Sequence, residues 1–196
     1  MSEVQKLPVQ VYTEMTPNPE TMKFVSNQTF LAGTSVDYPT AADVVETPVA
    51  DELFKFPFVN GVFIANNFIT VTKKAEYEWE DIIFSLRDWV KEYLEAEKPI
   101  FSEKFDITAI TPKEVIKNYS EDEQKIVDIL EKYVRPAVEM DGGNITFRKY
   151  DEGIVTVGLQ GSCSGCPSST VTLKAGIEGL LKRMMPDVKE VVAEML

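Results

Sequence analysis

Both cysteines of this chain lie in one short loop, Gly161-Ser-Cys-Ser-Gly-Cys-Pro167, and its 196 residues include no histidine. A strand-like run precedes the loop, and a proline directly after the second cysteine favours the start of a helix. The flanking glycines let the backbone approach whatever the two sulfur atoms hold. Structural zinc sites and the usual iron–sulfur sites need four ligands, which two thiolates of one chain cannot supply. Either the pair works in redox exchange, or a second molecule supplies the missing ligands.

Composition limits the classes of partner. The chain is 44% hydrophobic and 27% charged, with a formal net charge of −12. Nucleic-acid and anionic membrane surfaces require clustered lysine and arginine, so we expect neither as a partner. The first residues resemble neither a signal peptide nor an arginine-rich transit peptide, and no apolar run approaches the roughly 20 residues of a spanning helix. We therefore expect a cytoplasmic protein, where a C-x-x-C pair is more often metal-binding or catalytic than structural.

The pattern of apolar residues predicts a first domain over residues 9–96 that mixes strands with helices. It contains a turn signal at Thr16-Pro-Asn-Pro19 and an N-cap followed by proline at Thr47-Pro48. A long amphipathic helix, with Trp79 and Trp89 on its apolar face, closes the domain. The predicted strands run through Val9–Tyr12, Met22–Val25, Thr29–Leu31, Phe58–Ile64 and Phe68–Thr72.

Residues 97–119 are predicted to be a linker, with a short helix near Lys113–Lys117, and residues 120–196 a second domain. This domain begins with a capping box at Ser120–Glu123. Two strands, the cysteine loop, a helix from Pro167 and a last edge strand follow, so the order is α-β-β-α-β. The whole chain is thus predicted to be α+β with two small domains. The buried stripe of its first helix is expected to be Ile126, Val127, Leu130, Tyr133 and Val134, and the strands Ile145–Tyr150, Ile154–Leu159 and Val188–Val192.

The position of the cysteine loop predicts its chemistry. Cys166 precedes the first helical residue, where unpaired backbone N–H groups and the helix dipole favour a thiolate. We expect a lowered thiol pKa, which serves both metal binding and thiol exchange. Serine hydroxyls in and after the loop, at Ser162, Ser164, Ser168 and Ser169, are candidate donors to sulfur.

At these motifs the chain resembles a known family. Val134-Arg-Pro-Ala137, Asp141-Gly-Gly143, the loop Gly161–Ser169 and Leu173-Lys-Ala-Gly-Ile-Glu178 resemble the C-terminal domain of NifU-like (Nfu) iron–sulfur cluster proteins. Thr16-Pro-Asn-Pro19, Met22-Lys-Phe24 and the segment from Val62 to Thr72 resemble the Nfu N-terminal domain. The resemblance covers nearly the whole chain except the linker.

The resemblance implies a scaffold or carrier rather than an enzyme. It implies that Cys163 and Cys166 from each of two chains ligate a [4Fe–4S] cluster, and the same four thiolates also suit a bridging [2Fe–2S] cluster. The implied assembly is a cluster-bridged homodimer. An upstream assembly scaffold and apo iron–sulfur target proteins are the implied partners.

Three other features have both a purely structural and a functional interpretation. Asp141-Gly-Gly143 could line the cluster loop or meet a partner, but a helix-to-strand turn explains it better. Arg135 could steer a partner or simply form a surface ion pair. The acidic tract Glu76, Glu78, Glu80 and Asp81 could be a docking face, but carboxylates are also favoured at the start of any helix.

Two alternatives to the cluster carrier remain open. Thioredoxin-like oxidoreductases also place C-x-x-C between a strand and a helix, but here the proline follows the second cysteine and no βαβ unit precedes the motif. A zinc-bridged dimeric adaptor is the second alternative, because four thiolates across a dimer also suit Zn²⁺. A hydrolase is poorly supported, since the chain has no histidine base and no G-x-S-x-G motif.

Overall fold

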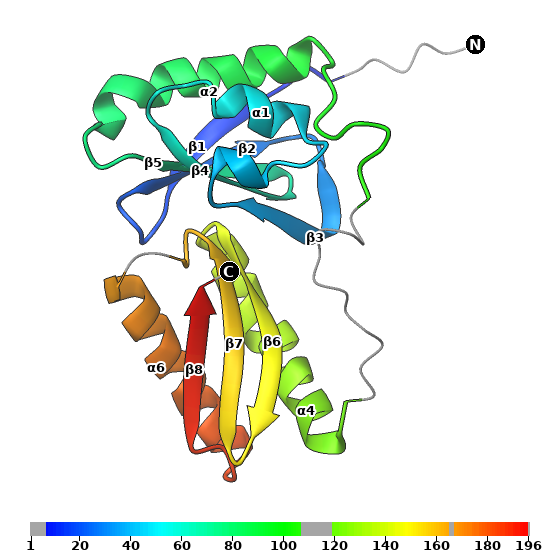
Figure 1. Cartoon of the computed structure of the whole chain (residues 1–196), viewed down its shortest axis with the longest axis vertical. Helices are drawn as coiled ribbons and strands as arrows, with labels where there is room; N and C mark the ends of the chain where they lie inside the picture. Colours follow the sequence, from blue (N-terminus) through cyan, green and yellow to red (C-terminus); the bar gives the residue numbers. More distant parts are fainter. Residues whose placement is uncertain (1–6, 107–118, 165–166, 196) are drawn as a thin grey trace.

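The computed structural model describes residues 7–106, 119–164 and 167–195. Side chains in the segment 167–170 and at position 195 lie outside this description, as does the helix predicted near Lys113–Lys117. The chain forms two domains stacked end to end (Figure 1), each with its own sheet and helices. The α+β class with two domains, predicted from the sequence, is confirmed.

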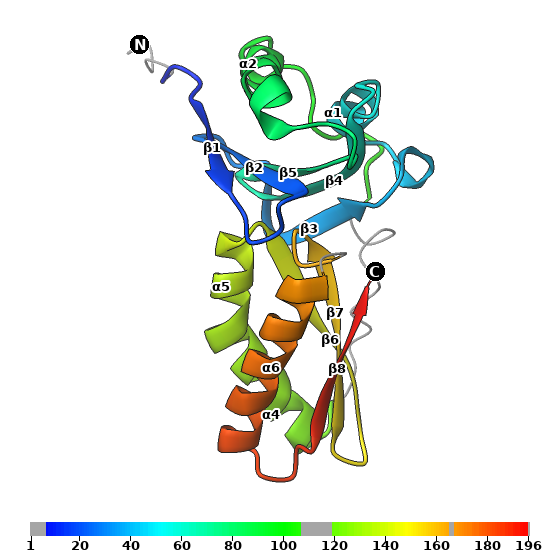
Figure 2. The same cartoon turned by 90° about the vertical axis from the view of Figure 1, so that its left-hand side faces the viewer.

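The N-terminal domain is a five-stranded antiparallel sheet covered by helices on one face. Its strands lie in the order β1-β2-β5-β4-β3. Helices α1 and α2 lie on the face that points away from the other domain (Figure 2). The opposite face of the sheet is directed at the C-terminal domain. The elements are β1 (Val11–Met15), β2 (Thr21–Ser26), β3 (Leu31–Tyr38), the 3₁₀ turn η1 (Ala41–Asp43), α1 (Pro48–Leu53), β4 (Val59–Asn66), β5 (Phe68–Lys73) and α2 (Trp79–Glu95).

Strand alternation divides the side chains of this sheet between two apolar clusters. Phe24, Ile64 and Ile69 face the helices and belong to the main core. Phe63 and Phe68, their neighbours in sequence, belong to a separate small cluster on the other face. Since successive strand residues point to opposite faces, a strand that is apolar throughout must be covered on both sides. The second cover is the C-terminal domain.

Most of the predicted elements of this domain are present, but β3 is longer than expected. The sequence indicated a strand over Thr29–Leu31, whereas β3 runs from Leu31 to Tyr38 with an irregular register between Leu31 and Ser35. Gly33, at positive φ, lies in this irregular stretch and interrupts the alternation of inward and outward side chains from which a strand is recognised in the sequence. Segment 97–106 continues from α2 along the domain, with Ile100, Phe101 and Phe105 packed against its core.

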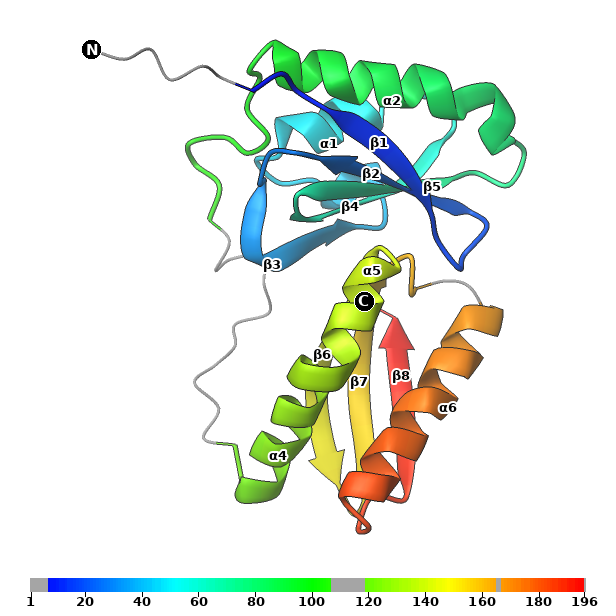
Figure 3. The same cartoon turned by 180° about the vertical axis from the view of Figure 1, so that it is seen from behind.

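The C-terminal domain is a three-stranded sheet with its helices on one face (Figure 3). The strand order is β6-β7-β8, with β6 antiparallel and β8 parallel to β7. Its core includes Ile145, Val157, Ile177 and Leu181. The predicted α-β-β-α-β order and the capping box at Ser120 are present. The elements are α4 (Glu121–Ile129), η2 (Leu130–Val134), α5 (Arg135–Met140), β6 (Gly143–Asp151), β7 (Ile154–Gly161), α6 (Pro167–Met184) and β8 (Glu190–Met195).

The first helix of this domain contains a π-helical turn, η2, that corrects one core assignment. Tyr133 was expected in the buried stripe but is 49% exposed. Pro136 has no N–H to donate to a carbonyl four residues back, and the N–H of Arg135 instead bonds the carbonyl of Leu130. A π turn shifts every later side chain around the helix axis relative to a regular α-helix. The sequence stripe was drawn with 3.6-residue spacing and therefore misplaced Tyr133.

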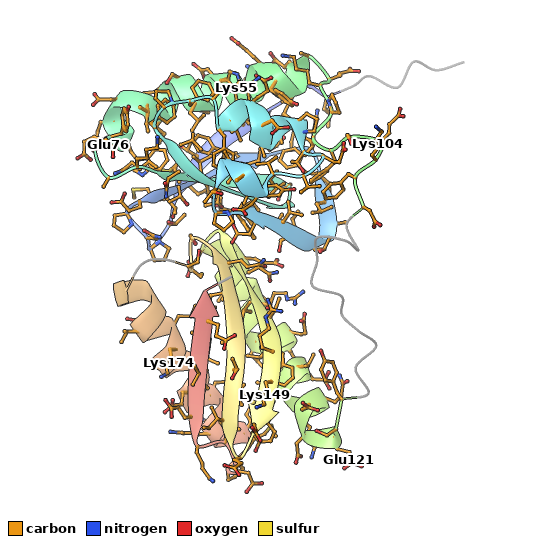
Figure 4. All side chains as sticks on the ribbon, viewed as in Figure 1. Lys55, Glu76, Lys104, Glu121, Lys149 and Lys174 are labelled. Carbon is orange, nitrogen blue, oxygen red and sulfur yellow. The ribbon has the colours of Figure 1, made fainter. Side chains whose placement is uncertain are left out.

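Charged side chains occupy the outer surfaces of both domains. Figure 4 shows Lys55 and Glu76 on the N-terminal domain and Lys149, Lys174 and Glu121 on the C-terminal domain, all away from the junction. The junction combines neutral polar and aromatic side chains with three charged ones, Lys23, Asp37 and Glu139. No helix within the described residues combines the length and apolar character that crossing a bilayer requires.

Candidate functional site

The cysteine loop, residues 161–166, connects β7 to α6 at the end of the C-terminal domain that faces the N-terminal domain (Figure 1). The structure describes the loop from Gly161 to Ser164. Cys166 lies outside the described residues, so its role as a ligand stays a prediction. Cys163 is the candidate ligand that lies within the described part of the loop.

Cys163 is buried against the start of β6. Its side chain is only 6% exposed and belongs to the core of the C-terminal domain. A β-carbon built on Gly143 would lie 2.8 Å from the Cys163 sulfur, so only a glycine backbone can pass so close. Glycine at position 143 is thus explained by the approach of the sulfur.

The environment of Cys163 contradicts the expected low thiol pKa. Burial raises its pKa to about 11, and the nearby Asp141 carboxylate acts in the same direction. A hydrogen bond with Ser162 lowers the pKa, but by less than burial raises it. Removal from water disfavours the charged thiolate more than the loop stabilises it. The prediction of a lowered pKa is therefore wrong for Cys163 in this arrangement.

The serines of the loop mainly hold the loop itself. The Ser162 hydroxyl lies 3.9 Å from the Cys163 sulfur and also donates to the carbonyl of Asp141. The Ser164 hydroxyl donates to the carbonyl of Gly161 at 2.8 Å rather than to sulfur. The side chains of Ser168 and Ser169 lie outside the described residues. Of the two predicted sulfur donors whose side chains the structure describes, Ser162 is thus the one within reach of Cys163.

The Asp141-Gly-Gly143 turn is the direct neighbour of the cysteine loop. Gly142 has φ of +80°, which favours glycine, and this ends α5 and starts β6. Its carbonyl accepts hydrogen bonds from the Ser162 N–H at 3.2 Å and from the Thr70 hydroxyl at 2.9 Å. The preferred interpretation, a helix-to-strand turn, holds, but the turn also lines the loop and meets the other domain.

The N-terminal domain contacts the loop at points that the sequence analysis missed. The side-chain amide of Asn18 donates to the carbonyls of Ser162 at 3.2 Å and Ser164 at 3.5 Å. The Asp37 carboxylate accepts the Gly161 N–H at 3.1 Å. Burial raises the pKa of Asp37 to about 6, although this hydrogen bond lowers it. The Thr16–Pro19 motif was the one sequence signal that could have drawn attention to Asn18.

A cavity of about 570 Å³ opens beside Cys163 between the helices of the C-terminal domain. Its walls come from η2 and α5 on one side and α6 on the other, and Pro17 of the N-terminal domain lies at its edge. Apart from Asp141, Ser162, Cys163 and Thr172, the lining is mainly apolar: Tyr133, Val134, Ala137, Leu173, Gly176, Ile177 and Leu180. Arg135, by contrast, forms an ion pair with Glu131 at 2.5 Å, as its purely structural interpretation predicted.

Within the described residues, no group of three or more histidine, cysteine or acidic side chains could hold a metal ion. A metal site at Cys163 would need ligands beyond those of the described residues.

Comparison with known proteins identifies the family of the chain. Residues 126–192 match the NifU-like domain family, and residues 11–97 match the family described as scaffold protein Nfu/NifU N terminal. The human NFU1 iron-sulfur cluster scaffold homolog, mitochondrial, is 34% identical over 92% of this chain and 70% of its own length. The chain belongs to the Nfu family. It is thus related to iron–sulfur cluster scaffold proteins, as the sequence motifs indicated.

Two further relatives carry the same printed name. Proteins with the same printed name from Drosophila sechellia and Drosophila willistoni are 34% and 36% identical over 92% of this chain. The chain spans 63% and 62% of their length. A solution NMR structure of a NifU-like protein from Saccharomyces cerevisiae matches 53% of this chain and 93% of its own, at 21% identity and a TM-score of 0.44.

The names of these Nfu relatives correct the expected location. The sequence analysis predicted a cytoplasmic protein, but the relatives are named as mitochondrial. This finding overturns the prediction, which relied on the lack of a recognisable targeting pattern in the first residues.

Proposed function

We propose that this protein binds a [4Fe–4S] cluster between two chains and passes it to apo iron–sulfur proteins. Cys163 and Cys166 of each chain are the proposed ligands, giving four thiolates around one cluster. The cluster is the cargo of the protein and is bound and released. We propose no catalysed reaction of a small substrate.

The observation that carries the proposal is the place of Cys163. It lies in a glycine-flanked loop between a strand and a helix, beside the cavity and three residues before the other cysteine. Membership of a family of cluster scaffolds makes an iron–sulfur cluster the best candidate for what the loop holds. A site shared between two chains is also easier to open than a four-cysteine site enclosed within one chain, which suits donation.

Binding requires the loop to change. Cys163 is buried with a raised pKa, and a cysteine must lose its proton to ligate iron. Because Cys163 is only 6% exposed and its sulfur lies against Gly143, the sulfur is proposed to leave this backbone and turn outward as the cluster arrives. Metal ligation then offsets the cost of forming the thiolate.

Release to a target is proposed to proceed by ligand exchange. Thiolates of an apo-protein displace the cysteines of the two chains one at a time in a transient complex. An upstream assembly scaffold is the proposed source of the cluster.

The test is the content of iron and acid-labile sulfide after anaerobic reconstitution, measured on the size-exclusion peak together with the mass. About two irons and two sulfides per chain at dimer mass support the bridging [4Fe–4S] cluster, and about one of each supports a bridging [2Fe–2S] cluster. Bound zinc without iron favours the zinc-bridged adaptor. A reversible Cys163–Cys166 disulfide without retained iron overturns the proposal in favour of the thiol–disulfide oxidoreductase.

Variants of the loop make this test specific. Cys163→Ser and Cys166→Ser should each lose the cluster. Ser164→Ala changes the same loop without removing a proposed ligand and should retain iron. Full iron in either cysteine variant would refute that residue as a ligand.

A further inference from the structure

The face of the N-terminal sheet that points away from α1 and α2 is buried against the C-terminal domain. We call it the lower face; it comprises the strand residues Lys23, Val25, Ser35, Asp37, Phe63, Ala65, Phe68 and Thr70. Figures 1 and 2 both place it against the end of the C-terminal domain that carries the cysteine loop. Five of these eight residues lie in the segments that resemble the Nfu N-terminal domain, Met22–Phe24 and Val62–Thr72, and none of the eight is explained by cluster ligation.

The aromatic centre of the lower face packs directly against the start of the cysteine loop. Gly161 has φ of +63°, and a β-carbon built on it would lie 2.9 Å from the Phe63 ring and 2.7 Å from the Gly142 carbonyl. Phe63 is only 1% exposed and packs with Phe68 and Val25. The loop thus begins in direct contact with a ring from the other domain.

Polar groups surround this aromatic centre, and each one meets the same end of the C-terminal domain. Thr70, 1% exposed, donates to the Gly142 carbonyl. Ser35 accepts from the side-chain amide of Asn144 at 2.8 Å, and both side chains are buried. The Lys23 ammonium donates to the Met140 carbonyl at 3.3 Å. The partners span the α5–β6 turn and the strand beside it.

The Thr16–Pro19 turn closes the edge of this interface. Asn18 is 4% exposed, and its amide bonds two carbonyls on either side of Cys163. Pro17 lies at the edge of the cavity next to the same cysteine. The turn therefore fixes the backbone that would have to move for the sulfur of Cys163 to turn outward.

We propose that the N-terminal domain is a reversible cap whose lower face binds the cysteine loop of its own chain and keeps Cys163 inaccessible. Its occupant is the C-terminal domain, through the α5–β6 turn and residues 160–164. The contacts are mostly single hydrogen bonds between neutral groups, which exchange with water at small net free energy, so the cap can lift. If the proposed shared cluster is correct, the cap and a second chain compete for the loop.

The first experiment measures the cap without any cluster. In metal-free full-length Cys166→Ser protein, Cys163 is the one remaining cysteine, and its alkylation by iodoacetamide reports opening of the loop. Adding Asn18→Ala or Thr70→Val should speed alkylation about tenfold, because each removes hydrogen bonds to the closed loop and its turn. Thr70→Val is nearly isosteric and suits a strand, so it tests the cap even if Asn18→Ala disturbs folding.

The control is Asn27→Ala. The Asn27 amide bonds the carbonyl of Pro8 within the N-terminal domain and does not touch the loop. Its alkylation rate should equal that of the parent. Equal rates for Asn18→Ala, Thr70→Val and the parent would overturn the cap.

A second experiment separates failure of the cap from failure of the proposed function. Ser35→Cys with Asn144→Cys places two thiols where a 2.8 Å hydrogen bond joins the domains. Once the disulfide between positions 35 and 144 is verified by mass spectrometry, the locked chain should take up less than about a tenth of the iron taken up by an equally oxidised Ser35→Cys control. If the control takes up iron and the locked chain takes up as much, the cap does not compete with a second chain for the loop, but the proposed cluster carrier still stands. If the unmodified protein takes up no iron, the proposed cluster-carrier function is wrong. The alkylation rates of Cys163 then still test whether the N-terminal domain acts as a cap.

Discussion

The side-chain amide of Asn18 donates a hydrogen bond to the carbonyl of Ser162, 144 positions further along the chain, at 3.2 Å. This contact joins the turn motif of the N-terminal domain to the residue next to Cys163. Two segments that the sequence presents as independent motifs therefore form one unit. On the proposed function, the access of Cys163 to iron would depend on the N-terminal domain as well as on its own loop.

Gly161→Ala should destabilise the cysteine loop by about 2 to 4 kcal/mol. The new β-carbon would be strained at φ of +63° and would collide with the Phe63 ring and the Gly142 carbonyl. Urea unfolding followed by far-UV circular dichroism measures the loss. Tryptophan fluorescence is unsuitable, because Trp79 and Trp89 both lie in α2 of the other domain.

The matched control is Gly179→Ala in α6. A β-carbon there meets nothing within 4 Å, and alanine favours a helix, so stability should rise by about 0.5 to 1 kcal/mol. If Gly161→Ala is as stable as the parent, the close packing between the domains is wrong.

Asp37→Asn should stabilise the protein near neutral pH and have little effect near pH 4. The pKa of Asp37 is raised from 3.8 to about 6, so the folded protein binds more protons than the unfolded chain between these values. Its contribution to stability is thus greatest below about pH 4 and is lost as the pH rises through about 6. Asparagine still accepts the Gly161 N–H and does not ionise.

The expected gain at pH 7 is about 1 to 2 kcal/mol, less than the full pKa difference implies, because part of the Asp37 side chain remains exposed to solvent. Urea unfolding of the parent and of Asp37→Asn between pH 4 and pH 7.5 gives the difference in their free energies of unfolding at each pH. The contributions of the other carboxylates are the same in both proteins and cancel in this difference. A difference that does not change with pH would show that Asp37 titrates normally.

Ser120→Ala should cost the C-terminal domain about 1 kcal/mol. The Ser120 hydroxyl accepts the Glu123 N–H, and the Glu123 carboxylate accepts the backbone N–H of Ser120. The change removes the first of these two bonds, which is the N-cap half of the capping box, and leaves the backbone donor of the second. Ser85→Ala, the same substitution in the middle of α2, should be neutral or slightly stabilising. Amide exchange in α4 distinguishes the two, and unchanged exchange in Ser120→Ala would contradict the role of the cap.

Local signals in the sequence were sufficient for most of the fold. Helical spacing identified α2, and alternation and turn residues identified β4, β5, β6 and β7. The errors arose where a proline or a glycine changes the backbone conformation, which the spacing of apolar residues does not report. Pro136 produces a π turn that exposes Tyr133, and Gly33 interrupts the alternation in β3.

The candidate site was only partly predictable for a related reason. The sequence identified Cys163, but the direction of its pKa shift depends on how deeply tertiary packing buries the sulfur. Asn18, Asp37 and Thr70 reach the loop and its turn from 72 or more positions away in sequence. Apart from the Thr16–Pro19 motif, which contains Asn18, the sequence offers no pattern that reveals such contacts.

Cys163 is predicted to have two separable roles, as a ligand and as part of the core. Cys163→Ala and Cys163→Ser should both abolish iron binding, since neither side chain ligates iron as a thiolate does. Their effects on stability should differ. Cys163→Ala leaves a small void in the core and should cost about 1 kcal/mol, whereas Cys163→Ser buries a hydroxyl and should cost about 1 to 3 kcal/mol. Iron content and urea unfolding of the metal-free variants measure the two roles independently. Equal stability of both variants and the parent would show that Cys163 contributes nothing to the core, and iron retained by Cys163→Ala would show that it is not a ligand.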